Sequence, residues 1–230
     1  MLFYSQKEGS EILKKTAIPI ILAIIIQTNV YAINTNFKDI KPTDWYSTPV
    51  IRVAEQGYIN GYEDNTFKPN KNMTVREFMV ILDKYIQTKS LKDRTPETVK
   101  TELLDIDWGY KETQNVLKKL YKKKIEQFNT KNLDREITRE EVVFLIANSL
   151  QYENKEYRTN IKDIQNSQYK PEIQIMLNKK IINGYQDNTF RPKKKITRAE
   201  VVIIIDNLIQ QGGTKWQKKD LEQQKSLKKT

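Results

Sequence analysis

The side chains best suited to bind a ligand in this sequence are arginines beside expected helix starts. Arg139 and Arg198 each follow a Thr that has a Glu three residues later, the pattern of a capped helix start. A helix start presents free N–H groups and a positive dipole end, which favour an anion. A guanidinium there can fork onto a carboxylate. We therefore expect Arg198 to contact an anionic ligand, with a surface ion pair as the alternative.

Aromatic residues and Gly-Tyr pairs form the second group of candidates. Trp45 and Tyr46 either fill a gap between helices or offer an apolar face to a sugar ring, and the sequence leaves both interpretations open. The glycine of each Gly-Tyr pair is expected to adopt a positive φ in a turn, and it could also admit a ligand close to the backbone. The two pairs are Gly61-Tyr62 and Gly184-Tyr185.

Composition argues against several classes of enzyme and metal site. The chain has no His and no Cys, so it lacks the usual neutral-pH general base, a thiol nucleophile, thiolate metal ligands and disulfides. Catalysis by carboxylates, Lys or Ser remains open on composition alone. We predict no enzyme activity, no catalytic residues, no metal site and no cofactor.

The charge balance and the N-terminus point to an extracellular setting. Lys14-Lys15, the apolar run 17–26 and Val30-Tyr31-Ala32 have the order of a secretory signal; an uncleaved signal anchor is the alternative. The run is too short for a typical membrane span, so no stable span is expected after its removal. The net charge of +11 favours anionic partners. For a secreted chain we expect a cell-wall polymer and no nucleic acid.

Internal repeats organise the rest of the chain. The segment 37–40 recurs at 161–164, and 61–69 recurs at 184–192. These shifts are twice about 62 residues, which predicts a middle copy; we identify one that opens at Leu104-Asp105-Ile106 and ends at 137–141, without the Gly-Tyr loop. The predicted parts are a signal peptide at 1–32, repeats at 33–88, 100–151 (degenerate) and 160–211, and a basic mobile tail at 212–230.

Each repeat is expected to be helix–loop–helix, which makes the fold all-α. Apolar residues spaced by three and four precede each loop, and Gly57 follows the first such stretch as a C-terminal cap would. The second helices begin with capping boxes at Thr74, Thr138 and Thr197. One repeat cannot bury its own apolar face, so the three are expected to share a core. Phe67 and Phe190 are expected to anchor the loops in that core.

The pattern Phe-x-Asp-Ile, Trp-Tyr, Gly-Tyr-x-Asp-x-Thr-Phe-x-Pro and Ile-Thr-Arg-Ala-Glu resembles the S-layer homology domain. The resemblance covers nearly all of residues 37–211. It implies a pseudo-threefold, three-pronged helical assembly that binds secondary cell-wall polymers, often pyruvylated, in grooves between the prongs. The first copy departs from the motif, because Val75 takes the arginine position and Arg76 follows it. Only the third copy is complete, so we expect one or two working grooves rather than three equal ones. We assign the best site to the third repeat, with Arg198 and the Gly184-Tyr185 loop.

The predicted function is therefore non-covalent anchoring of a secreted protein to the bacterial cell wall through an anionic polysaccharide. The expected binding residues are Arg198, Arg139, Trp45, Tyr46, Gly184, Tyr185, Gly61, Tyr62 and Arg76. Peptidoglycan and other surface proteins remain open as partners. The alternative function is a structural protein of the cell surface whose repeats bind another surface protein. A wall hydrolase is disfavoured, because no stretch of 100 or more residues lies outside the repeats.

Overall fold

A computed structural model describes residues 35–95, 97–153 and 157–212 of this chain. The predicted signal peptide and all of the predicted tail except Gly212 lie outside the described residues. None of the helices in the described ranges combines the length and apolar character needed to cross a bilayer.

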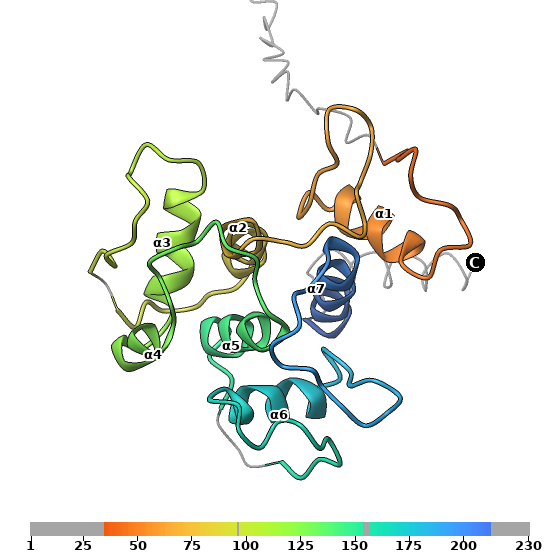
Figure 1. Cartoon of the computed structure of the whole chain (residues 1–230). Helices are drawn as coiled ribbons and strands as arrows, with labels where there is room; N and C mark the ends of the chain where they lie inside the picture. The colour runs from red at the N-terminus through yellow and green to blue at the C-terminus, as the bar shows by residue number, and fades with distance from the viewer. Residues whose placement is uncertain (1–34, 96, 154–156, 213–230) are drawn as a thin grey trace, which may run out of the picture. The chain divides into compact units, whose positions relative to one another are not determined.

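The described ranges contain helices and isolated β-bridges but no strand, which confirms the all-α prediction (Figure 1). The helices are α1 (Ser47–Glu55), α2 (Val75–Gln87), α3 (Tyr110–Lys118), α4 (Lys122–Gln127), α5 (Arg139–Ser149), α6 (Lys170–Asn178) and α7 (Arg198–Gly212). Six of them follow the predicted helix–loop–helix order. The short α4 of the middle repeat was not predicted.

Helices pack between repeats rather than within them. The second helix of one repeat lies against the first helix of the next, as α2 does on α3 and α5 on α6, and the last helix, α7, packs on α1. Figure 1 shows α2, α5 and α7 towards the middle of this arrangement, with α1, α3 and α6 outside them. This pairing brings the start of each second helix to a loop of a neighbouring repeat.

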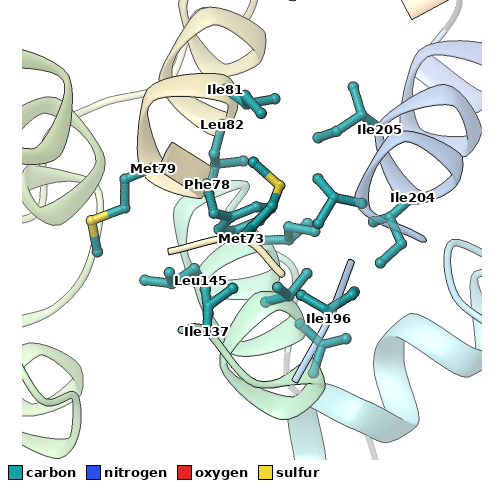
Figure 2. Close-up of a cluster of buried hydrophobic side chains, with 14 of the residues drawn as sticks. Met73, Phe78, Met79, Ile81, Leu82, Ile137, Leu145, Ile196, Ile204 and Ile205 are labelled. Carbon is teal, nitrogen blue, oxygen red and sulfur yellow. The ribbon is translucent and has the colours of Figure 1, made fainter. Parts of the chain in front are cut away.

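The core lies where α2, α5 and α7 converge. Buried side chains from the segments before and within these helices meet in one cluster (Figure 2). Three antiparallel bridges, Asn72 to Thr197, Thr74 to Glu136 and Thr138 to Lys195, join the segments that lead into the three helices. Phe67 and Phe190 are fully buried, as expected for loop anchors.

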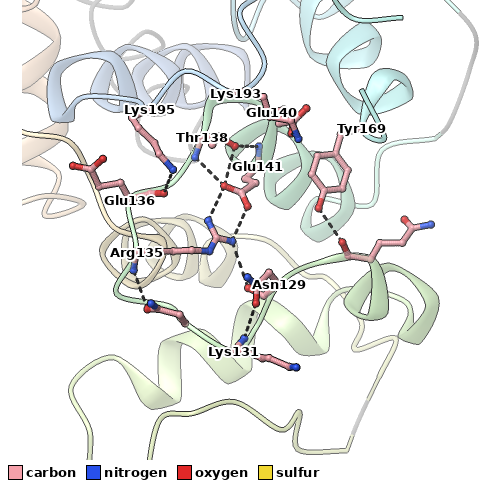
Figure 3. Close-up of polar contacts among 12 residues, drawn as sticks. Asn129, Lys131, Arg135, Glu136, Thr138, Glu140, Glu141, Tyr169, Lys193 and Lys195 are labelled. Carbon is pink, nitrogen blue, oxygen red and sulfur yellow. Dashed lines mark hydrogen bonds and ion pairs between the residues drawn. The ribbon is translucent and has the colours of Figure 1, made fainter. Parts of the chain in front are cut away.

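The three predicted capping boxes are confirmed. The Thr74, Thr138 and Thr197 hydroxyls accept from the backbone N–H of the Glu three residues later, which in turn accepts from the backbone N–H of the Thr. A cation six residues before each Glu pairs with it, through Lys71 (2.9 Å), Arg135 (2.6 Å) and Lys194 (2.9 Å). Figure 3 shows this arrangement around the start of α5.

The middle repeat opens differently from the prediction at Leu104-Asp105-Ile106. Asp39 in the first repeat accepts from the Phe67 and Lys68 backbone N–H groups at 2.7 Å, and Asp163 clamps the third loop in the same way. Asp105 does not have this place; it lies three residues before Trp108 in an exposed turn. Asp105 is therefore not the counterpart of Asp39, since Trp45 lies six residues after Asp39 and Trp108 only three after Asp105. The bounds of the middle repeat stay a prediction.

Candidate functional site

The guanidinium of Arg198 lies on a loop of the first repeat. Its Nε donates to the Phe67 carbonyl and its Nη2 to the Asn60 carbonyl, both at 2.8 Å. Its Cζ lies 4.9 Å from the centre of the Tyr62 ring and 4.6 Å from that of Phe67. The residue is only 6% exposed. The first turn of α7 thus holds a cation against the Gly61-Tyr62 loop.

Arg139 repeats this arrangement on the third repeat. Its Nε donates to the Phe190 carbonyl at 2.9 Å and its Nη2 to the Asn183 carbonyl at 3.0 Å. The guanidinium lies 4.8 Å from the Tyr185 ring centre. One difference is electrostatic, because a Glu200 carboxylate oxygen lies 4.0 Å from Arg139 Nη1. Arg198 forms no ion pair within the described ranges.

The expectation that Arg198 and the Gly184-Tyr185 loop make one site is wrong. Arg198 meets the loop of the first repeat, and Arg139 of the middle repeat meets the loop of the third. The backbone causes this, because α7 starts beside the first repeat, with the Arg198 N–H donating to the Lys71 carbonyl at 2.9 Å. Each site is therefore shared between repeats.

Burial sets the electrostatics of both arginines. Loss of water lowers the pKa of Arg198 and of Arg139, and nearby Tyr and acidic groups offset this only in part. A desolvated cation is costly unless polar groups or an anion compensate it. Carbonyl oxygens and aromatic faces supply that compensation on one side of each guanidinium. On the other side, Arg198 Nη1 makes no hydrogen bond to the described part of the chain, so a ligand could bind there.

A groove of about 360 Å³ runs past Arg198. We call it the Tyr62 groove; its lining includes Asn60, Gly61, Tyr62, Lys84, Trp108 and Arg198. These residues come from all three repeats. Trp108 is 59% exposed, so an aromatic face, a tyrosine and a guanidinium border the same opening.

The second site, the Tyr185 site, lies around a cavity of about 460 Å³, with Arg139 behind the tyrosine. The cavity is lined by Gly184, Tyr185, Gln186, Asp187 and Arg191. The Arg191 guanidinium lies 4.0 Å from the Tyr185 ring centre, and Lys194 Nζ donates to the Tyr185 hydroxyl at 3.0 Å. Lys194 also pairs with Glu200. The site thus gathers cations around one aromatic side chain, but Arg191 pairs with Asp187 and Lys194 with Glu200.

The two glycines are required by close packing, which corrects the positive-φ expectation. The positive-φ glycines in the described ranges are Gly57 and Gly109. A Cβ on Gly61 would lie 2.3 Å from Phe37 Cε1, and one on Gly184 would lie 2.5 Å from Ile161 Cδ1. Within these two loops, the residues that take positive φ are the turn asparagines Asn65 and Asn188 and the cations Lys68 and Arg191.

Trp45 lies at the start of α1 and is 65% exposed, with Tyr46 edge-on at 5.2 Å. It does not line the Tyr62 groove. Trp108 is its counterpart at the start of α3, because Asp44 and Asp107 each accept from the backbone N–H three residues before, at 2.7 and 2.8 Å. The exposure of Trp45 argues against the gap-filling interpretation for that residue, whereas Tyr46 is partly buried against the core. The sugar-face interpretation stays a prediction.

Arg76 lies apart from the other two arginines. Its Nη1 donates to the Trp108 carbonyl at 3.1 Å and its Nη2 to Asp134 at 2.5 Å. The buried Val75 occupies the position that Arg139 and Arg198 have in their helices. The structure therefore gives no third arginine-on-loop arrangement in the described ranges.

Sequence reasoning missed the carbonyl acceptors Asn60 and Asn183 and the groove residue Lys84. The Asn residue before each Gly-Tyr pair was a visible signal, because it is part of the repeat. Lys84 gave no signal, because the residue type at its position differs among the repeats. No group of three or more acidic side chains in the described ranges could hold a metal ion.

Comparison with known proteins supports part of this picture. The S-layer homology domain model matches residues 36–78 and 160–202. The chain is 25% identical to a cellulosome-anchoring protein of Acetivibrio thermocellus over 76% of its length, 27% identical to an amylopullulanase of Thermoanaerobacterium thermosulfurigenes over 77%, and 25% identical to cell surface glycoprotein 1 of A. thermocellus over 75%. These alignments cover 26%, 10% and 8% of the relatives. The S-layer homology resemblance is thus supported for residues 36–78 and 160–202, and the match does not extend to the middle repeat.

Proposed function

We propose that this chain anchors a protein to the bacterial cell surface by binding an anionic cell-wall polysaccharide, without catalysis. The ligand carries acidic groups, such as a ketal-linked pyruvate, and enters the Tyr62 groove and the Tyr185 site. The proposal fits the printed names of two similar proteins, a cellulosome-anchoring protein and a cell surface glycoprotein. The aligned region is a minor part of each relative, so these names support anchoring and no more.

One observation carries the proposal: a buried guanidinium without an ion pair borders an open groove. Arg198 is 6% exposed, lines the Tyr62 groove and leaves Nη1 free of hydrogen bonds to the described ranges. An incoming carboxylate would supply a counter-charge in place of the hydration that burial has removed. Charge-assisted hydrogen bonds are among the strongest that proteins make.

The aromatic side chains of the groove suit a sugar. Tyr62 and Trp108 border the same cavity, and aromatic rings offer apolar faces with polar edges. Sugar rings present apolar C–H faces between hydroxyls, so they match such a wall. Positive net charge adds long-range attraction to an anionic polymer.

The second candidate, binding of another surface protein, has one specific observation in its favour. Leu104 and Ile106 are 62% and 85% exposed on the turn before Trp108. Exposed apolar side chains that lie close together mark protein contact sites more often than isolated ones do. Two such residues make a small patch, so the groove carries more weight.

Sedimentation of the purified chain with cell walls tests the proposal. The chain should sediment with walls that carry their secondary polymer and stay soluble with walls stripped of it. Equal sedimentation in both cases would overturn the polysaccharide proposal and point to peptidoglycan. Failure to sediment with either, together with capture by a surface-protein fraction, would favour the second candidate.

A further inference from the structure

The Tyr62 groove contains a second cation besides Arg198. Lys84 on α2 is half-buried and lines the groove. Its Nζ donates to the Gly57 carbonyl at 2.9 Å, and Lys84 forms no ion pair within the described ranges. Burial lowers the pKa of its ammonium group, and the charge of Glu112 opposes this only in part.

The acid that lines the groove, Glu77, forms no ion pair with Arg198 or Lys84 in the described ranges, although its charge partly offsets the burial of Arg198. Glu77 is bound by Lys71 at 2.9 Å and by the Thr74 backbone N–H at 2.9 Å. Its charge is therefore already matched within the first repeat. Lys84 and Arg198 remain as two partly desolvated cations that have no ion-pair partner among the described residues, and each favours an anion.

Comparison of the repeats separates the structural role of Lys84 from its charge. Lys84 lies ten residues after Thr74, and Asn207 lies ten residues after Thr197. Asn207 Nδ2 donates to the Ile181 carbonyl at 3.1 Å, which lies near the end of α6 as Gly57 lies near the end of α1. A neutral amide is sufficient for this bond. The positive charge of Lys84 is thus an addition that helix packing does not require.

We propose that Lys84 is a specificity-determining residue that makes the Tyr62 groove select a glycan segment with two acidic groups. One anionic group would meet Arg198 and the other Lys84. In the third repeat the matching sequence position holds the neutral Asn207, so we expect that repeat to bind a segment with one acidic group. This inference rests on the proposed function, since it assigns the ligand of the same groove. The acidic groups can be carboxylates or phosphates, because either supplies anionic oxygens.

The test exchanges the two residues between the repeats in the full chain. Lys84→Asn removes the charge but keeps a donor for the carbonyl, as Asn207 does, and Lys84→Arg keeps the charge. Asn207→Lys adds the charge to the third repeat. The probe is polymer released from purified walls, titrated at several salt concentrations. Thermal unfolding of each variant verifies that it is folded.

We expect Lys84→Asn to bind native polymer roughly tenfold more weakly and with a smaller salt dependence, Lys84→Arg to bind like the wild type, and Asn207→Lys to bind more tightly. Two treated polymers identify the acidic group that Lys84 meets. One has its carboxylates amidated by carbodiimide, and the other has its phosphodiesters cleaved by hydrofluoric acid. The difference in affinity between wild type and Lys84→Asn should disappear with one of these polymers. Its loss with the amidated polymer identifies a carboxylate, and its loss with the acid-treated polymer identifies a phosphodiester. Unchanged affinity and salt dependence for Lys84→Asn, with the wild type binding, would overturn the inference. No binding by the wild type would instead overturn the proposed function.

Discussion

Replacing Arg198 by Ala should cost stability as well as binding. The change leaves the buried Phe67 carbonyl without its donor at 2.8 Å, and an unsatisfied buried polar group costs about 1–3 kcal/mol. It also removes a cation from the faces of Phe67 and Tyr62, a contact that contributes about 0.5–2 kcal/mol. The substitution also removes the desolvation cost of the buried guanidinium, which offsets part of this loss of stability. We expect a net loss of about 1–3 kcal/mol, or about 2–12 °C in melting temperature.

Arg139→Ala is the matched control, because its guanidinium makes the same pair of carbonyl bonds in the other site. Differential scanning calorimetry should give similar losses of melting temperature for the two variants. Polymer affinity measured below both transitions should fall more for Arg198→Ala, since Arg139 already has Glu200 at 4.0 Å. An unchanged melting temperature for Arg198→Ala would refute the reasoning about its buried hydrogen bonds. A greater loss of affinity for Arg139→Ala would refute the importance assigned to the missing ion pair.

Three further changes test the packing and the charges of the fold. Gly184→Ala places a Cβ 2.5 Å from Ile161 Cδ1 and should cost about 1–3 kcal/mol in thermal unfolding; Ile161→Val deletes that atom and should recover part of the loss, and full additivity of the two changes would contradict the steric cause. Burial raises the pKa of Asp83, so protonation favours the folded state and its contribution is lost as pH rises through the raised pKa. Asp83→Asn should therefore raise the melting temperature at neutral pH, with a gain that shrinks in acid; a gain independent of pH would exclude this cause. Arg52 binds the Asp206 carboxylate at 3.0 and 3.1 Å, and Arg52→Met leaves this carboxylate buried without its cation. Urea unfolding should show a loss of about 1–3 kcal/mol in the free energy of unfolding, a value reduced by the partial exposure of Arg52. An unchanged free energy of unfolding would contradict this expectation.

The sequence predicted the local features of the fold because local residues determine them. A capping box needs only a Thr and a Glu three residues apart, so all three helix starts were found. Gly57 likewise has the positive φ of a C-terminal cap and follows directly from its place after α1. The short α4 was missed because the six residues Lys122–Gln127 carry too little apolar periodicity to be recognised.

The sequence identified residues of the candidate sites, but it did not predict which arginine lies on which loop. The sequence pointed to Arg198 and to both Gly-Tyr pairs, yet it assigned Arg198 to the loop of its own repeat. The correct partner follows only from α7 packing on α1, a contact between the two ends of the repeat array. The role of Gly61 was misjudged for a similar reason, because the atom that excludes a Cβ belongs to Phe37, far from the loop in sequence.

The shared construction of the Tyr62 groove has a consequence for how binding and folding are linked. Tyr62, Trp108 and Arg198 come from three different repeats, so the groove exists only when α7 has packed on α1 and α2 on α3. A ligand that binds only this closed arrangement stabilises it by mass action. We therefore expect the middle repeat to be required even without a Gly-Tyr loop, because it supplies Trp108 to the Tyr62 groove and Arg139 to the Tyr185 site.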